Sequence, residues 1–147
     1  MNRAPSSHLL VALQLTGVAL SCYPVGWQNH GHPLWLVFCA IGTALGITTL
    51  CYNKLGNFSV YPEPKTGTEL ITHGPYQHAR HPMYTSLIVM MFGIVCYNGH
   101  WLNVPGLALV LIAVLLKADR EEVLLAQVFT QYPAYCDKTR RFIPGIY

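Results

Sequence analysis

Two long uncharged segments dominate the pattern of hydrophobic and polar positions along this chain. Residues 4–53 and 81–116 contain no Asp, Glu, Lys or Arg, and both are largely apolar. A helix needs about 20 mostly apolar residues to cross a hydrocarbon core of about 30 Å. The first segment therefore has room for two membrane-spanning helices. The second segment barely fits two, which predicts a close helical hairpin.

Turn-forming residues divide each uncharged segment into two helices. Pro, Gly and Asn residues cluster in 24–33, and Asn98-Gly99-His100 forms a second predicted turn. Pro33 and Pro82 are expected in first helical turns, where the missing N–H costs nothing. The predicted spans are 7–23, 33–52, 82–97 and 104–117, and the fourth helix is expected to continue past Lys117 into water. Gly42 and Gly46, four residues apart, fit close packing between helices.

Two polar segments complete the chain. The loop 53–81 is rich in Pro and Gly, and 118–147 opens with residues at three- and four-residue steps: Glu121, Leu124, Leu125, Val128, Phe129 and Tyr132. This spacing predicts an amphipathic helix that ends or kinks at Pro133. The predicted fold class is therefore all-α. We expect an integral-membrane bundle of about four transmembrane helices, one domain over residues 1–147, with a cytoplasmic loop and a C-terminal amphipathic helix.

The positions of the basic residues predict the orientation. The loops 24–32 and 98–103 contain no Lys or Arg, whereas the N-terminus, the central segment and the C-terminal segment contain all nine. Because positive charge marks the cytoplasmic side, both termini and the central loop are predicted to be cytoplasmic. A bacterial inner membrane is favoured over the endoplasmic reticulum. A signal peptide or lipoprotein cleavage site ending at Ser21-Cys22 is the alternative interpretation, but a second apolar run follows almost at once.

Composition excludes several classes of protein. Hydrophobic residues make up 52% and charged residues 10%, whereas soluble domains carry about 25% charged residues. A disordered chain is excluded on this ground. A net charge of +3 without a basic stripe predicts no nucleic-acid partner. The five cysteines form no C-x-x-C pair and are interpreted as buried thiols. The histidines predict no metal site.

The first candidate for chemistry lies where the central loop enters the third helix. Arg80 and His81 directly precede Pro82, at a helix N-terminus that carries about half a positive charge. Arg80 adds a planar fork suited to a carboxylate or phosphate. Tyr76 and Tyr84 add ring faces and hydroxyls. These residues predict a pocket for the anionic end of a ligand, and the alternative is that Arg80 and His81 only anchor the helix at lipid headgroups.

The second candidate lies where the fourth helix leaves the membrane. Glu121 falls on the apolar helix face, so its carboxylate needs a partner. Arg80 and a ligand with cationic or hydroxyl groups are both possible partners. The alternative is a solvated ion pair between Lys117 and Glu121, which are four residues apart. Glu122 is about 100° away around the helix, so the two glutamates do not share one direction.

These residues resemble the isoprenylcysteine carboxyl methyltransferase family, and are more distantly similar to the phospholipid N-methyltransferases. The resemblance covers about the C-terminal 90 residues in three pieces. The first piece is Asn57-Phe58-Ser59 with Pro62-Glu63-Pro64 and Glu69-Leu70, and the second is Gly74-Pro75-Tyr76 with Arg80-His81-Pro82-Met83-Tyr84. The third piece is Glu121-Glu122 with Leu124-Leu125, Phe129, Tyr132, Tyr135 and Arg141-Phe142-Ile143-Pro144.

The resemblance implies an integral-membrane methyltransferase that uses S-adenosylmethionine, releases S-adenosylhomocysteine and has no Rossmann domain. It implies a cofactor site formed by Gly74, Pro75, Tyr76, Arg80, His81, Pro82, Tyr84, Glu121 and Glu122. Two positions depart from the family pattern. Ser86 stands where members often have Gly, and Pro133 interrupts a stretch that is usually continuous helix.

The chemistry of the residues is consistent with that cofactor. Arg80 suits the carboxylate of S-adenosylmethionine, and a buried glutamate suits its ammonium or ribose hydroxyls. The ring faces of tyrosines suit its adenine or its sulfonium. Arg80 and Glu121 are the predicted catalytic residues: Arg80, or Arg141, orients a carboxylate or thiolate acceptor, and Glu121 or Glu122 takes a proton from an amine. A lipid-like or small hydrophobic acceptor is expected to arrive from the bilayer. The alternative function is a non-enzymatic small membrane protein, such as an assembly factor or carrier. The sequence predicts no oligomeric state.

Overall fold

The computed structural model describes residues 5–24, 31–57, 59–64 and 67–145, and every regular element within these ranges is helical. Four long helices form the bundle: α1 (Pro5–Cys22), α2 (Leu36–Asn57), α3 (Pro82–Asn98) and α4 (Asn103–Val128). A short helix α5 (Tyr132–Lys138) and two 3-10 turns, η1 (Pro33–Trp35) and η2 (Gly74–Gln77), complete the order. The all-α prediction is confirmed for the described residues, and the number of membrane spans stays a prediction.

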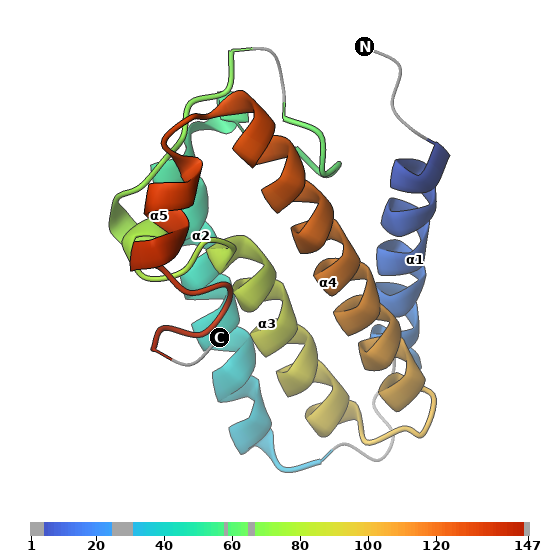
Figure 1. The fold of residues 1–147 in the computed structure, drawn as a ribbon. Coiled ribbons are helices and arrows are strands. Elements are labelled where there is room, and N and C mark those ends of the chain that lie inside the picture. The colour runs from blue at the N-terminus through green and yellow to red at the C-terminus, as the bar shows by residue number, and fades with distance from the viewer. Residues whose placement is uncertain (1–4, 25–30, 58, 65–66, 146–147) are drawn as a thin grey trace.

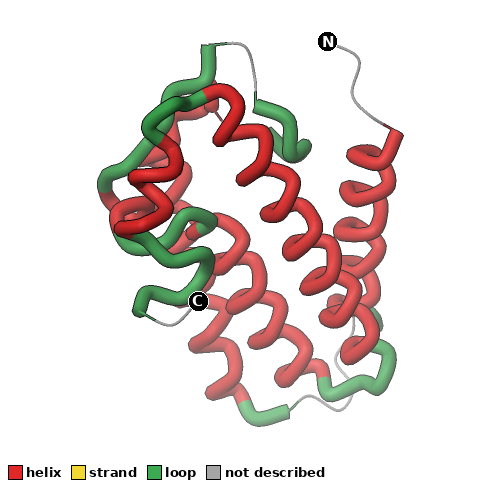
Figure 2. Tube along the Cα trace, in the orientation of Figure 1, coloured by secondary structure: helices red, strands yellow, loops and turns green. Residues whose placement is uncertain are grey.

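The four long helices run alternately in opposite directions (Figure 1). α1 packs along α4 and α2 packs along α3, while α3 joins the two pairs through contacts with α1 and α4. The central loop, η2 and α5 gather at one end of the bundle (Figure 2). This end receives the C-terminal end of α4 and the N-terminal end of α3, which carry the residues predicted to form the site.

Three helices begin and end close to their predicted bounds, and two boundaries differ. α2 continues to Asn57, five residues beyond the predicted span, because its polar last turn is outside the apolar run but contains no proline. The Asn57 side chain then pairs with the backbone N–H and carbonyl of Glu69. α4 does extend past Lys117 as predicted. The turn predicted around Gly99 is confirmed, with Gly99 in the left-handed conformation at φ 63°.

The predicted helix through Tyr132 is wrong in its end point. α4 ends at Val128, and Phe129 is extended with φ −117° and ψ 110°. The ring of a helical Pro133 would clash with the carbonyl of residue 129 and could not hydrogen-bond to it. The chain therefore leaves the helix four residues before the proline. Pro133 then lies in the first turn of α5, a position that proline favours.

Within the described residues, two helical stretches are long and apolar enough to cross a membrane, Pro5–Cys22 and Pro33–Asn53. The helix Pro82–Asn98 is apolar but shorter, at 17 residues. Large apolar side chains on the outer face of α2 are exposed, including Leu36, Val37 and Ile41. These helices and their bare apolar faces indicate association with a membrane.

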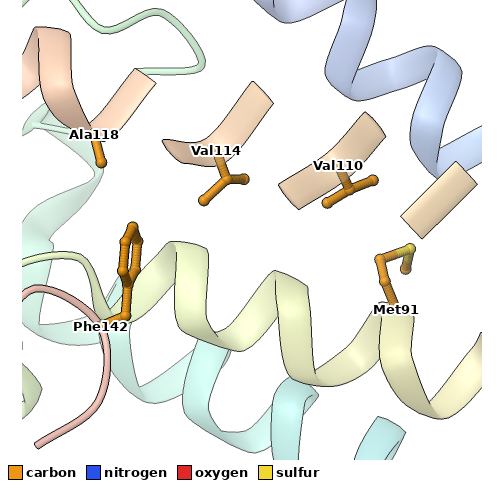
Figure 3. Close-up of a cluster of buried hydrophobic side chains, with 5 residues drawn as sticks. All are labelled: Met91, Val110, Val114, Ala118 and Phe142. Carbon is orange, nitrogen blue, oxygen red and sulfur yellow. The ribbon is translucent and has the colours of Figure 1, made fainter. Parts of the chain in front are cut away.

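Buried side chains of α3 and α4 form the core, and the C-terminal segment closes one end of it. Val110, Val114 and Ala118 of α4 are fully buried and lie in a row, with Met91 of α3 opposite Val110 at one end of it (Figure 3). Phe142 packs beside Ala118 at the other end of the row. The core therefore joins α3 and α4 to the segment that follows α5.

Glycines allow the paired helices to approach closely. A Cβ atom on Gly42 of α2 would lie 2.7 Å from the backbone nitrogen of Met90 and 2.8 Å from the carbonyl oxygen of Ser86. A Cβ on Gly17 of α1 would lie 2.8 Å from the carbonyl oxygen of Gly106 in α4. The predicted packing role of Gly42 is confirmed, because no larger side chain fits without separating α2 from α3.

Substitution of Gly42 by valine should destabilise the bundle by about 1–3 kcal/mol, the usual effect of overpacking. The measurement is the apparent melting temperature of the purified protein in detergent. Ala44→Val is the matched control, because Ala44 is exposed on the same helix. Equal melting temperatures for the two variants would contradict the close α2–α3 contact.

Candidate active site

The start of α3 is fixed by backbone bonds to the segment that follows α5. The N–H groups of Arg80 and His81 donate to the carbonyl oxygens of Arg140 and Arg141, at 2.7 and 3.0 Å. The Thr85 hydroxyl donates to the carbonyl oxygen of Phe142 at 3.0 Å. We call residues 139–142 the C-terminal strap. It holds the Arg80-His81-Pro82 corner in place from outside the bundle.

One carboxylate oxygen collects the positive charges of this corner. Glu122 Oε1 accepts from Arg80 Nε at 2.9 Å and from Arg141 Nε at 3.3 Å, and lies 3.2 Å from His81 Nε2. Arg80 also donates to the carbonyl oxygens of Thr139 and Cys136. Arg141 pairs in addition with Asp119. Arg80 therefore pairs with Glu122. From the sequence Arg80 is a possible partner of Glu121, but it contacts the neighbouring glutamate instead.

His81 links the two glutamates through its two ring nitrogens. Nδ1 lies 3.3 Å from Glu121 Oε2, and Nε2 lies 3.2 Å from Glu122 Oε1. The ring is 5% exposed and stacks on Tyr84, with centroids 5.6 Å apart. The Tyr84 hydroxyl donates to Glu121 Oε1. Two carboxylates that point in different directions are thus joined by one buried imidazole.

These contacts change the pKa values of the groups involved. Burial disfavours ionisation of Glu122, but hydrogen bonds from His81 and Arg80 and their charges outweigh it and hold the pKa at about 2. Burial likewise opposes the charged form of His81, yet its two glutamate partners raise its pKa. Burial raises the pKa of Tyr76, Tyr132 and Tyr135. The corner is therefore a charged cluster beside neutral tyrosines.

A cavity of about 410 Å³ lies next to this cluster, within the range of small-molecule sites. All five helices contribute to its wall, together with residues of the central loop. Of the residues predicted to form the site, those on the wall are Tyr76, Arg80, His81, Pro82, Tyr84 and Glu121. The cavity continues between α2 and α3 along apolar or small residues: Gly46, Leu50, Ser86, Leu87 and Met90.

Three residues predicted to form the site lie outside the cavity wall. Glu122 lies behind it, where it holds Arg80 and His81. Gly74 and Pro75 open η2, which presents Tyr76. Gly74 has φ +62°, and a Cβ there would lie 2.5 Å from the Tyr52 ring, so only glycine fits. These three residues position the wall rather than form it.

Two residues of the cavity wall carry buried polar atoms that are poorly satisfied. Glu63 Oε2 has no hydrogen-bond partner among the described residues. The hydroxyl of Tyr132, a residue that is 3% exposed, has the Cys136 thiol, a weak acceptor, beside it. The other carboxylate oxygen of Glu63 accepts from Ser7 of α1. Burying a polar group without a partner is costly. A ligand that accepts from the tyrosine and donates to the glutamate would remove this cost.

Several wall residues were not assigned to the site from the sequence. Gln14 comes from α1, Glu63 from the central loop and Lys117 from α4. Lys117 donates to Gln14 Oε1 at 2.7 Å and to the Val60 carbonyl at 2.6 Å, and the sequence-based ion pair with Glu121 is not formed. One signal in the sequence could have identified Gln14 as a candidate. Gln14 is the one amide in the apolar run from Leu9 to Leu20.

The fold and the cavity define a class: a small helical, membrane-associated protein with a ligand site at one end of its bundle. A charged histidine–glutamate–arginine cluster borders that site, and five tyrosines line it. This arrangement can bind a ligand that combines charged groups with flat rings. Within the described residues no cluster of His, Cys, Asp or Glu is suited to hold a metal ion.

Comparison with known proteins places the chain in a family. A family model described as phospholipid methyltransferase matches residues 34–132, and the chain belongs to this family. Its members are integral-membrane methyltransferases related to the isoprenylcysteine carboxyl methyltransferases, so the resemblance seen in the sequence is confirmed. α1 and the C-terminal strap lie outside the matched range.

One similar protein is named for metal resistance and not for methyl transfer. The nickel-cobalt-cadmium resistance protein NccN of Alcaligenes xylosoxydans xylosoxydans is 29% identical over 122 residues. The alignment covers 79% of this chain and 57% of that protein. The chain thus spans little more than half the length of this relative.

The Glu122 cluster predicts a pH-dependent stability. Because the pKa of Glu122 is lowered from about 4.3 in an unfolded chain to about 2, its stabilising effect is full above pH 4.3 and disappears towards pH 2. Glu122→Gln should therefore cost about 2 kcal/mol at pH 7 and progressively less below pH 4. Thermal unfolding between pH 3 and pH 7 measures this difference. Asp137→Asn, at an exposed position, is the charge-matched control, and a Glu122→Gln deficit that stayed constant with pH would contradict the assignment.

Proposed function

We propose that this protein is an integral-membrane, S-adenosylmethionine-dependent methyltransferase with a lipid-like or small hydrophobic acceptor. The observation that carries the proposal is the coincidence, in the wall of one cavity, of the Arg80-His81-Pro82 corner, Glu121 and two residues with poorly satisfied buried polar atoms, Glu63 and Tyr132. Family membership supports the reaction class. The apolar extension of the cavity between α2 and α3 supports the acceptor class.

The residues on the cavity wall fit the proposed cofactor. The Tyr132 hydroxyl is a buried donor for a carboxylate, and Glu63 Oε2 is a buried acceptor for an ammonium group or ribose hydroxyls. Tyr76, Tyr84 and Tyr135 offer ring faces for an adenine or a sulfonium. Arg80 lies on the cavity wall as a cation, and its ion pair with Glu122 stabilises the guanidinium in this position.

In this proposal the protein acts by positioning. The bound cofactor supplies an already activated methyl group, so no protein nucleophile is needed. The His81 imidazole, clamped by Glu121 and Glu122, fixes one side of the cavity, and the residues of α5 close it against water. Orientation of two reactants of this kind can supply about 7–11 kcal/mol of a barrier. Glu121 is the base for an amine acceptor, and Arg80 orients an anionic one.

The proposal includes a topology. The alternating helices place the end of α4 and the start of α3 on one side of the bundle, and residues 31–35 and 99–102 on the other. Four spans with cytoplasmic termini would put every loop that lacks Lys and Arg outside. A bacterial inner membrane fits this arrangement. The acceptor then reaches the cavity from the bilayer or its cytoplasmic surface.

Binding of S-adenosylmethionine tests the proposal, and Tyr132→Phe is the sharpest variant. The Tyr132 hydroxyl has the Cys136 thiol, a weak acceptor, beside it, so its removal should lower the melting temperature little. It should weaken cofactor binding about tenfold, the effect of one lost hydrogen bond to a charged group. Titration calorimetry on the detergent-purified protein gives the affinity, with Tyr23→Phe, at the opposite end of α1, as the matched control.

Glu121→Ala and Arg80→Ala should abolish saturable binding. Arg80→Ala also breaks contacts to the C-terminal strap, so its folding must be checked by melting temperature. A folded wild-type protein that binds no S-adenosylmethionine would refute the proposed cofactor.

A further inference from the structure

Lys117 is a buried cation on the cavity wall, and its hydrogen-bond partners are neutral groups. The residue is 1% exposed. Its ammonium donates to the Gln14 amide oxygen and the Val60 carbonyl, and it lies 5.4 Å from the centre of the Tyr84 ring. Three segments far apart in the sequence, α1, the central loop and α4, therefore meet at one positive charge.

No carboxylate is hydrogen-bonded to this ammonium within the described residues. Glu121, one helical turn away, acts on the Lys117 charge at longer range, but its carboxylate contacts the Tyr84 hydroxyl and His81. Burying a charge without a directly bonded counter-charge is unfavourable. Carbonyl and amide oxygens lessen this cost, and an anion bound at the ammonium would lessen it further.

Lys117 and Glu63 are held at different points of α1. Gln14, the partner of Lys117, is seven residues, or about 10 Å of helix, beyond Ser7, which holds Glu63. Lys117 sits level with Tyr84, where the apolar extension along Ser86, Leu87 and Met90 begins. An apolar molecule in this extension would therefore have its polar end beside the Lys117 ammonium.

We propose that Lys117, oriented by Gln14 and the Val60 carbonyl, binds the acceptor and selects one whose nucleophile is an anion, a carboxylate or a thiolate. This inference rests on the proposed methyltransferase function. Gln14 is a positioning residue, and it lies on a helix outside the range matched by the family model. Acceptor selection would thus depend on a part of the chain that the family pattern does not include.

The chemistry of transfer favours this match. A lone pair on the anionic oxygen or sulfur forms the new bond to the methyl carbon. The bond from that carbon to the donor sulfur breaks, and its electron pair stays on the donor as a neutral thioether. The products are a methyl ester or methyl thioether, and no proton is released. An amine acceptor would instead enter as a second cation beside Lys117 or need a base to remove its proton.

Binding of a matched pair of probes tests the proposal without the cofactor. Hexanoate and hexylamine have the same chain and opposite charges, and their affinities for the protein in lipid nanodiscs are measured by titration calorimetry. The wild-type protein should bind hexanoate at least about tenfold more tightly than hexylamine. Equal affinities, or tighter binding of hexylamine, would overturn the proposal.

Two variants should abolish the preference by different routes. Lys117→Met removes the charge. Gln14→Glu is isosteric and neutralises Lys117 with a new ion pair, so it serves even where Lys117→Met fails to fold. Arg120→Met is the matched control: it removes a positive charge one turn further on, at a residue that contacts Ser6 and is not on the cavity wall. Retention of the hexanoate preference in folded Gln14→Glu would overturn the assignment.

Methyl transfer from labelled S-adenosylmethionine to hexanethiol, hexanoate and hexylamine distinguishes the acceptors. A labelled thioether or ester supports the proposal and tells the thiolate from the carboxylate, whereas labelled N-methylhexylamine overturns it. Failure to bind S-adenosylmethionine would refute the proposed function instead. The probe preference is measured separately, so the two failures are distinguishable.

Discussion

The structure depends on the partly buried carboxylate of Glu122. Its Oε1 atom is contacted by Arg80, His81 and Arg141, which come from the start of α3 and from the C-terminal strap. Removing one partner of such a cluster leaves the others with uncompensated charge. Glu122 is therefore what joins α3 and α4 to the segment after α5, and the cavity wall forms on top of this junction.

The sequence predicted the helices well because their signals are local. Uncharged runs, Pro82 at a helix start and Gly99 at a helix end each act within a few residues. The two boundary differences have local causes too, the proline-free last turn of α2 and the clash of Pro133 with residue 129. The resemblance identified the family, and six of the nine residues that it assigned to the site lie on the cavity wall.

Contacts between distant segments could not be predicted from spacing. On a helix, Glu121 and Glu122 point in different directions, and nothing local shows that His81 reaches both of them. The pairing of Arg80 with Glu122 rather than Glu121 follows from the path of the strap. Gln14 and Lys117 are 103 residues apart in the sequence. Only the packing of α1 along α4 brings them together.

The C-terminal strap also has a consequence for how the protein is made. Residues 139–142 follow all four long helices in chain order, so those helices are synthesised before the segment that completes the Glu122 cluster exists. During that interval Arg80 and His81 lack the backbone partners that fix the α3 corner. Assembly of the site is therefore a late event in biosynthesis. A nascent chain stalled before the strap would have its helices but an open, unfinished corner.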